Sequence, residues 1–258
     1  MRLLLASFLL LATPVLLVSQ TMTSGFFGGV GFGLVAHDNE PFSNRLASWS
    51  PPGEENRPRL YRTPAVSNTG YTLNAGGALL LGSTFVVGAS GEMLFFPSFE
   101  AVTTEDDRGT YTLSGGGGGL DIGYAVINDD ATILWPYISV GYYGYSLAFE
   151  NSSGEPTPFF EGDPVPAGAI ETYTGAAFRP GLGIALTRFI GGATAAGDPS
   201  GLVVQARLGW GLFPSHPNWQ VDGVEVMNGG RTPCYSGVGL SVTVGGGIGS
   251  TEGGGDGR

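Results

Sequence analysis

Eight stretches of this sequence alternate large apolar residues with small or polar ones, and this period of two constrains the fold more than any other feature. Successive side chains of a β-strand point to opposite faces, so the period predicts strands. The predicted strands occupy residues 25–37, 70–82, 84–96, 110–127, 133–150, 172–190, 202–213 and 234–248. Each is long enough to cross a bilayer as a tilted strand, which takes about 9–11 residues. None has the period of about 3.6 residues typical of an amphipathic helix, so we expect an all-β fold.

The connections between the predicted strands are long and short in turn. Residues 38–69 form a long, proline-rich connection, whereas Ser83 alone separates the second strand from the third. Residues 128–132 form another tight turn, and long connections return after the fifth and the seventh strands. An up-and-down antiparallel barrel in an outer membrane has this arrangement, with short periplasmic turns and longer extracellular loops. The pattern therefore predicts an eight-stranded transmembrane β-barrel.

The two faces of each predicted strand differ in size. In the strand at 202–213, Leu208 and Trp210 share one face, and Arg207 and Gly209 share the other. A soluble barrel packs its large apolar residues into a core. The second face of these strands is mostly Gly, Ser and Thr, whose side chains are too small to form such a core. We therefore expect the large residues to face lipid and the small or charged ones to face the lumen.

Five consecutive glycines, Gly115–Gly119, look like a flexible linker but lead directly into an alternating apolar row. Gly 46 and Pro 17 make up about a quarter of the 258 residues, near the level of a low-complexity chain. The 42% apolar and 11% aromatic residues exclude a disordered chain. We interpret the glycines as strand residues where a narrow barrel crowds its lumen. On this interpretation Asp121, in the same strand, points inward.

The N-terminus has the pattern of a secretory signal peptide, with Arg2 before an apolar run that ends near Val18. We expect residues 1–20 to be the signal peptide, which directs secretion through the inner membrane. Residues 21–248 are then the barrel, and residues 249–258 a disordered tail rich in glycine and acid. The lone Cys234 excludes an internal disulfide framework.

The net charge argues against nucleic acid as a partner. The formal charge is −11, and all 11 basic residues are arginine. Binding to phosphates needs a basic face, which this composition does not supply.

Four charged residues occupy the predicted inward face: Glu92, Asp121, Arg179 and Arg207. Uncharged side chains that can join them are Gln205, Ser139 and Asn74. One interpretation is a hydrogen-bonded plug, because an eight-stranded lumen is only wide enough for side chains. The other is a gate or narrow ion path that opens when the pairs exchange partners.

Aromatic residues gather toward the ends of the later strands. We expect them to form the interfacial belts of a membrane barrel, with a ligand-stacking groove as the alternative. The residues concerned are Trp135, Tyr137, Tyr142, Tyr143, Tyr145, Trp210 and Phe213.

Catalytic motifs are not recognisable. The only histidines are His37 and His216, and both are expected on the extracellular side. The sequence has no zinc-protease, nucleophile-elbow or phosphate-loop motif, and its acidic turns do not follow calcium-loop spacing. We therefore expect a protein that is not an enzyme and that has no cofactor and no metal.

The alternating strands, the unequal connections and the inward charges resemble the small outer-membrane β-barrels of the OmpA/OmpX type. Residues 136–145 and 178–187 are similar to strands of that porin-like group. The resemblance implies the outer membrane of a Gram-negative cell envelope, outer-membrane lipids as partners, and assembly by the barrel-assembly machinery. The chain departs from the group in ending GGGIGSTEGGGDGR, without the terminal aromatic residue that such barrels commonly carry.

The function favoured by the sequence is structural, or recognition of a ligand by the extracellular loops. Three alternatives stay open: a small passive pore, a lipid-modifying outer-membrane enzyme, and a secreted soluble barrel that binds an apolar ligand.

Overall fold

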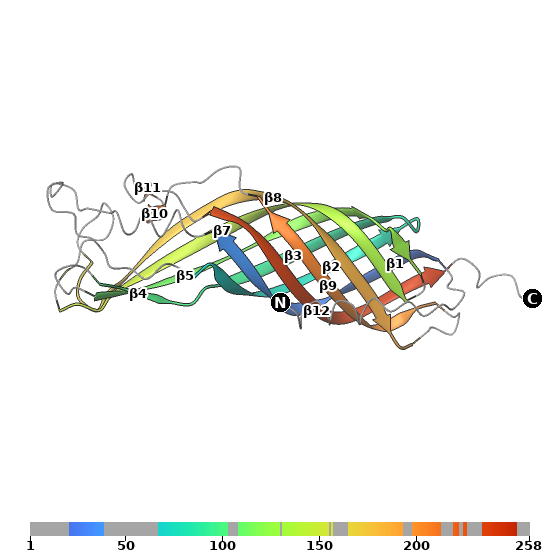
Figure 1. Cartoon of the computed structure of the whole chain (residues 1–258), viewed down its shortest axis with the longest axis horizontal. Helices are drawn as coiled ribbons and strands as arrows, with labels where there is room; N and C mark the ends of the chain where they lie inside the picture. Colours follow the sequence, from blue (N-terminus) through green and yellow to red (C-terminus); the bar gives the residue numbers. More distant parts are fainter. Residues whose placement is uncertain are drawn as a thin grey trace, which may run out of the picture.

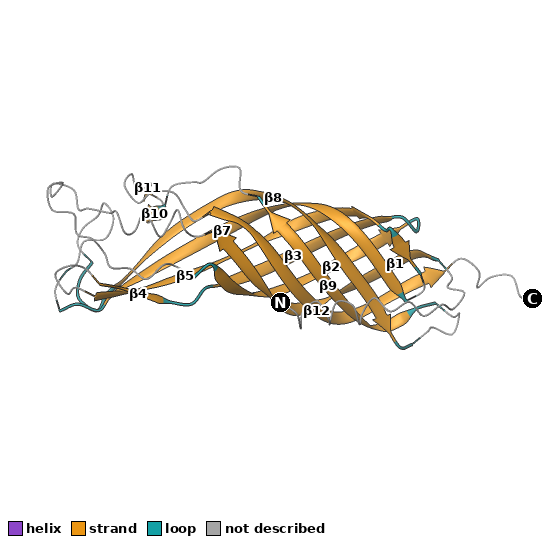
Figure 2. Ribbon diagram, viewed as in Figure 1, coloured by secondary structure: helices purple, strands orange, loops and turns teal. Residues whose placement is uncertain are grey.

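The computed structural model describes residues 21–38, 67–102, 108–129, 131–154, 156, 165–192, 198–212, 219–221, 224–225 and 234–251. Within these ranges every regular element is a β-strand, which confirms the all-β prediction (Figure 2). In this part of the chain, no helix is long and apolar enough to span a membrane. The predicted signal peptide and residues 252–258 lie outside the described residues.

Eight long strands form a closed barrel (Figure 1). Each pairs antiparallel with the next along the chain, and the last pairs with the first, so no long edge is left open. These strands are β1 (Met22–Asp38), β2 (Thr69–Leu81), β3 (Phe85–Phe95), β5 (Arg108–Tyr124), β7 (Thr132–Asn151), β8 (Ile170–Ile190), β9 (Ser200–Gly211) and β12 (Cys234–Thr251). Each overlaps one predicted strand, and β12 runs three residues past the predicted end of the barrel at 248.

Four short strands were not predicted, because elements of two to four residues are too short to show a period. They are β4 (Phe99–Val102), β6 (Ile127–Asn128), β10 (Gln220–Val221) and β11 (Val224–Glu225). β4 pairs with β5 and β6 with β7, while β10 joins β8 to β11. They extend the sheet beyond the eight strands that close the barrel.

The strand register places like residues side by side around the barrel wall. Leu208 pairs with Leu240 and Ile184, and the next residue along β9, Arg207, pairs with Ser241 and Ala185. Leu208 is 42% exposed on the outer face, whereas the side chain of Arg207 is 17% exposed inside the barrel. The predicted assignment of faces is confirmed for the apolar row of β9 and for the charged residues: Leu208 is outside and Arg207 is inside.

The glycines of β5 are strand residues, and two of them explain why that strand needs glycine. At Gly115 a Cβ atom would lie 2.6 Å from the Tyr145 ring. At Gly117 a Cβ would collide with the carbonyl oxygen of Tyr142 and with Tyr143. β7 thus approaches β5 so closely on the inner face that only hydrogen fits at these positions.

Two apolar clusters fill the barrel interior at different heights. The turn-end cluster includes Met22, Phe27, Leu80, Val86, Ile133, Trp135, Phe189 and Val203. The loop-end cluster includes Leu94, Phe96, Phe99, Tyr111, Leu147, Phe149, Tyr173 and Trp219. The charged residues predicted to face the lumen lie between these clusters in the strand register.

At the turn end, the side chain of Asn128 links three segments. The amide nitrogen of Asn128 donates to the carbonyl oxygens of Met22 and Ser83, each at 2.7 Å. This contact ties the β6–β7 turn to the start of β1 and to the β2–β3 turn. In the β2–β3 turn, Gly82 and Ser83 both have positive φ, 58° and 60°, as tight hairpins of this hand require.

The barrel is taller on one side than on the other. β5, β7 and β8 have 17, 20 and 21 residues, whereas β3 and β9, the strands on either side of these three, have 11 and 12. β5, β7 and β8 therefore continue past the end of the shorter strands toward the loops (Figure 1). Above the end of β9, Gln220 of β10 takes over the pairing with Thr174 of β8.

Candidate functional site

Among the residues that the structure describes, two ion pairs cross the lumen, and the first joins β8 to β3. Nη1 of Arg179 donates to Oε1 of Glu92 at 2.8 Å, with side-chain exposures of 12% and 21%. Two barrel strands, β5 and β7, separate β3 from β8. The pair therefore crosses the interior instead of running along the wall. The guanidinium of Arg179 also lies 4.9 Å from the centre of the Tyr143 ring, which is a cation–π contact.

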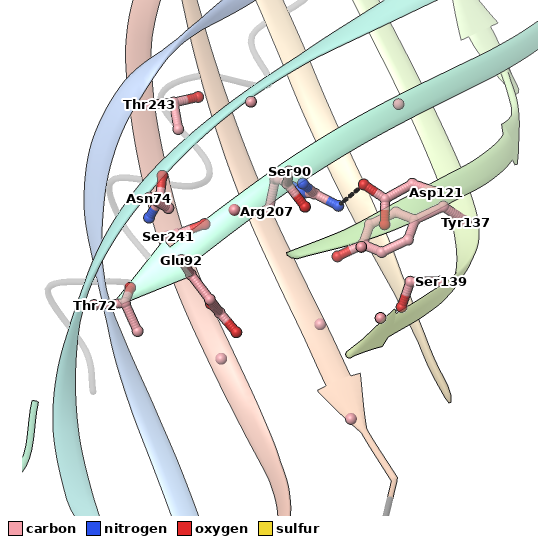
Figure 3. A pocket seen from close by; sticks show the side chains of 18 of the residues that line it. Thr72, Asn74, Ser90, Glu92, Asp121, Tyr137, Ser139, Arg207, Ser241 and Thr243 are labelled. Carbon is pink, nitrogen blue, oxygen red and sulfur yellow. Dashed lines mark hydrogen bonds and ion pairs between the residues drawn. The ribbon is translucent and has the colours of Figure 1, made fainter. Parts of the chain in front are cut away.

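The second ion pair joins β9 to β5 and has the same geometry. Nη2 of Arg207 donates to Oδ2 of Asp121 at 2.7 Å, and Asp121 is only 3% exposed (Figure 3). The guanidinium lies 4.6 Å from the Tyr137 ring and 5.9 Å from the Trp135 ring. Both arginines thus rest on aromatic residues of β7, which stacks them in position and shields them from solvent.

Pairing is what allows these charges to lie inside. Transfer of an isolated charge out of water costs several kcal/mol, and a close, hydrogen-bonded opposite charge offsets that cost. The two acids and two bases balance, so the lumen carries no net charge from these four groups. The arrangement can hold the two sides of the barrel together, and it can hinder the passage of ions.

Gln205 lies in the lumen but bonds to a hydroxyl group. Its Nε2 donates to Oγ1 of Thr187 at 2.9 Å, and the indole nitrogen of Trp135 donates to the same oxygen at 3.4 Å. Thr187 is fully buried, and sequence reasoning missed it as a functional residue. Its position in the alternation of β8, on the same inward face as Arg179, is the signal that could have identified it.

Beside the ion pairs, the lumen contains a cavity of about 120 Å³ (Figure 3). One side of it is formed by the bulky aromatic and arginine side chains of β7, β8 and β9. The other side is lined by smaller residues of β2, β3 and β12, which include Thr72, Asn74, Ser90, Ser241 and Thr243. The lumen is therefore filled unevenly, with a polar space against its small-residue wall.

The aromatic residues separate into two groups, which corrects the prediction of interfacial belts. Trp135, Tyr137, Tyr143 and Tyr145 are at most 9% exposed and face the lumen. The prediction was wrong for these four because it grouped them by nearness in sequence. They share the odd-numbered positions of β7 with Ser139, which was already assigned to the lumen.

The other predicted belt residues lie outside the barrel or beyond the described residues. Tyr142 is 55% exposed and Trp210 47% exposed on the outer face. Tyr142 packs edge-to-face on Phe178 of β8, with ring centroids 5.3 Å apart. Phe213 lies outside the described residues, so its placement stays a prediction.

The histidines do not assemble into a described catalytic site. His37 is 3% exposed at the loop end of β1 and packs against the Phe96 ring, with centroids 5.5 Å apart. His216 lies outside the described residues. Among the residues that the structure describes, no group of three or more His, Cys, Asp or Glu side chains is placed to hold a metal ion.

Comparison with known proteins finds similarity to solved structures but not to known sequences. No protein-family model matches this sequence, and no curated protein matches it. Among solved structures, the chain is similar to Ail, the attachment invasion locus protein of Yersinia pestis, at 8% sequence identity and a TM-score of 0.31. The match covers 90% of this chain and 99% of that one. The strand pairing itself establishes the architecture: a closed, antiparallel, up-and-down barrel of eight long strands, as the OmpA/OmpX resemblance implied.

Proposed function

We propose that this chain spans a bacterial outer membrane as a barrel, and one observation carries the proposal. Every strand of the barrel presents large apolar side chains on its outer face, such as Val30, Leu73, Phe85, Ile122, Ile138, Phe178, Trp210 and Val244. A soluble protein rarely exposes apolar patches beyond a few hundred Å², whereas lipid favours such a surface. The closed ladder also satisfies the backbone hydrogen bonds that a bilayer leaves without water.

Outer-membrane lipids and the barrel-assembly machinery are the partners that this placement requires. The tight turns then face the periplasm and the long connections face outward. The apolar start of the sequence supports export across the inner membrane.

The lumen, on this proposal, is closed, and the protein has a structural or surface-recognition role. Two ion pairs cross the interior, and apolar clusters fill it on either side of them. Ions would have to displace these groups to pass. Recognition then belongs to the long, acidic connections, and their ligand stays open. A catalytic role has little support, because the ring of His37 packs against Phe96.

A small pore is the second candidate, and the lumenal cavity favours it. The space beside the small residues of β2, β3 and β12 is polar, which suits hydrated ions if the ends of the barrel open. In that case the ion pairs would line the conducting path.

Single-channel recording in planar bilayers tests the two candidates. We expect purified, folded protein to give no conductance steps above the protein-free background, because the lumen is crossed by paired side chains. A general porin reconstituted in the same bilayers serves as the positive control. Steps from the wild-type protein that change in size in Glu92→Ala would overturn the closed-lumen proposal and establish the pore.

A further inference from the structure

The outer face of β5, β7 and β8 changes in character row by row toward the loops. By register, Tyr142 pairs with Phe178. Toward the loops, these two rings are the last large outward-facing apolar side chains on β7 and on β8 as far as Thr172. The next outward row is Gly116, Gly144 and Ala176, and the row after it is Ser114, Ser146 and Thr174. Toward the loops, the aromatic pair is therefore followed by a row of small residues and then by a row of hydroxyl-bearing residues.

These rows form a groove with a volume of about 430 Å³. Gly144 and Ala176 lie in its floor, the three hydroxyl-bearing residues line it, and Gln220 of β10 forms a further part of its wall. The volume falls in the range of about 300–1,000 Å³ that is usual for small-ligand clefts. Because β9 ends below this level, the groove lies on the part of the sheet that rises above the shorter strands.

The groove offers uncharged hydrogen-bonding groups. Among the described residues, the hydroxyls of Ser114 and Ser146 make no hydrogen bond, and Thr174 donates weakly to the Gln220 carbonyl oxygen at 3.5 Å. No described residue that lines the groove carries a charge. A phosphate group binds best to arginine or lysine, so this lining does not suit one. Hydroxyl groups of a sugar can both donate to and accept from serine and threonine.

The glycine in the floor is not required by the barrel. A Cβ atom at Gly144 would have its nearest neighbour 3.8 Å away, at the Gly175 carbonyl oxygen, so a side chain would fit there. This contrasts with Gly117, one strand away, where a Cβ would collide with backbone. The open space over Gly144 is therefore a property of the outer surface and not of strand packing.

We infer that the groove binds the uncharged saccharide headgroup of a membrane glycolipid, an inference that rests on the proposed placement of the barrel in a membrane. The acyl chains of such a lipid lie against the apolar face formed by Leu120, Ile138 and Val140. Its sugar reaches the hydroxyl row above Tyr142 and Phe178, whose rings take the apolar face of the sugar. The groove is continuous with the lipid-facing surface, which favours a lipid over a soluble glycan.

Native mass spectrometry of the barrel released from nanodiscs tests this inference. The nanodiscs contain phosphatidylcholine with equal small fractions of digalactosyldiacylglycerol and phosphatidylglycerol. We expect the wild-type protein to retain the glycolipid in preference to phosphatidylglycerol. We expect Gly144→Leu, which fills the groove, to lower glycolipid retention by about tenfold, or roughly 1.4 kcal/mol.

The matched control is Gly91→Leu, another outward glycine, where a Cβ would lie 3.5 Å from the nearest atom, the Gly117 carbonyl oxygen. It adds the same side chain to the outer face of β3, away from the groove, and retention should equal that of the wild type. If Gly144→Leu does not fold, the Ser114→Ala/Ser146→Ala variant removes the hydroxyls without adding bulk and should lower retention in the same direction.

Three results would overturn the inference. One is equal retention of both lipids by the wild type, and another is equal retention by the groove variants and the wild type. The third is binding of the free digalactosyl headgroup in solution as tightly as the intact lipid, which would point to a soluble glycan. A barrel that does not enter the nanodisc at all contradicts the membrane placement instead, so the two failures are distinguishable.

Discussion

Individual residues in the lumen are stabilised chiefly by their partners across the barrel. Asp121 is almost fully buried, and its carboxylate accepts from Arg207 at 2.7 Å. Burial of either group alone is unfavourable, since the remaining charge has neither water nor a counter-ion. The aromatic rings of β7 add to this by packing on the guanidinium groups.

The single variant Arg207→Met should be less stable than the double variant Asp121→Asn/Arg207→Met. The single change leaves Asp121 buried and unpaired, and we expect the free energy of unfolding to fall by about 3 kcal/mol. In Asp121→Asn/Arg207→Met both charges of this pair are removed and no buried charge is left without its partner, so the loss should be smaller. Urea unfolding in lipid vesicles, followed by tryptophan fluorescence, measures both. Equal destabilisation in the single and double variants would show that the ion pair is not the source of the effect.

At the scale of the element, β5 combines a long strand with a run of glycines. The inward glycines admit the tyrosine rings of β7, whereas the outward ones leave the surface shallow. Its length, with that of β7 and β8, raises one side of the barrel above the rest. One face of β5 thus packs against the tyrosine rings in the lumen, and the other face lines part of the outer groove.

Gly117→Val should prevent assembly of a compact barrel, because its Cβ would collide with the backbone and ring of β7. Gly91→Val, on the adjacent strand, adds the same side chain where there is room and should fold normally. Folded outer-membrane barrels run differently on gels before and after boiling, so heat-modifiable mobility distinguishes the two variants. Normal mobility shifts in Gly117→Val would contradict the close approach of β5 and β7.

For the whole molecule, the decisive property is which side of the wall each side chain occupies. Large apolar residues surround the outside, and the described charged pairs lie inside. A soluble barrel lacks such an apolar exterior, whereas here apolar residues cover the outside and also form two clusters in the interior. The surface is therefore suited to lipid, and in the interior two charged pairs lie between two apolar clusters.

Brominated phospholipids test this arrangement directly, because bromine on the acyl chains quenches nearby tryptophan. In a variant that keeps only Trp210, which is exposed on the outer face, we expect strong quenching. In a variant that keeps only Trp135, which is buried in the lumen, we expect little. Quenching of neither residue would indicate a soluble barrel, and equal quenching of both would contradict the inside–outside assignment.

Much of the architecture could be predicted from local sequence. The alternation along each strand depends only on backbone geometry, so it determined the eight strands, the outward Leu208 and Trp210, and the inward Glu92, Asp121, Arg179 and Arg207. The short strands β4, β6, β10 and β11 carry too few residues for such a signal. The interfacial belt was mispredicted for Trp135 and its neighbours because the alternation was not applied to them.

By itself, then, the sequence determined the fold class, the number of long strands and the faces of the charged residues and of the outward apolar rows, since these follow from the period of a strand. Only the tertiary structure decided which charges meet, because Arg179 and Glu92 are brought together by register and closure across two intervening strands. Closure also decided that aromatic residues of β7 fill one half of the lumen and leave a cavity at the other. The outer groove also depends on tertiary structure, because it forms only where β5, β7 and β8 lie side by side and extend beyond the shorter β3 and β9.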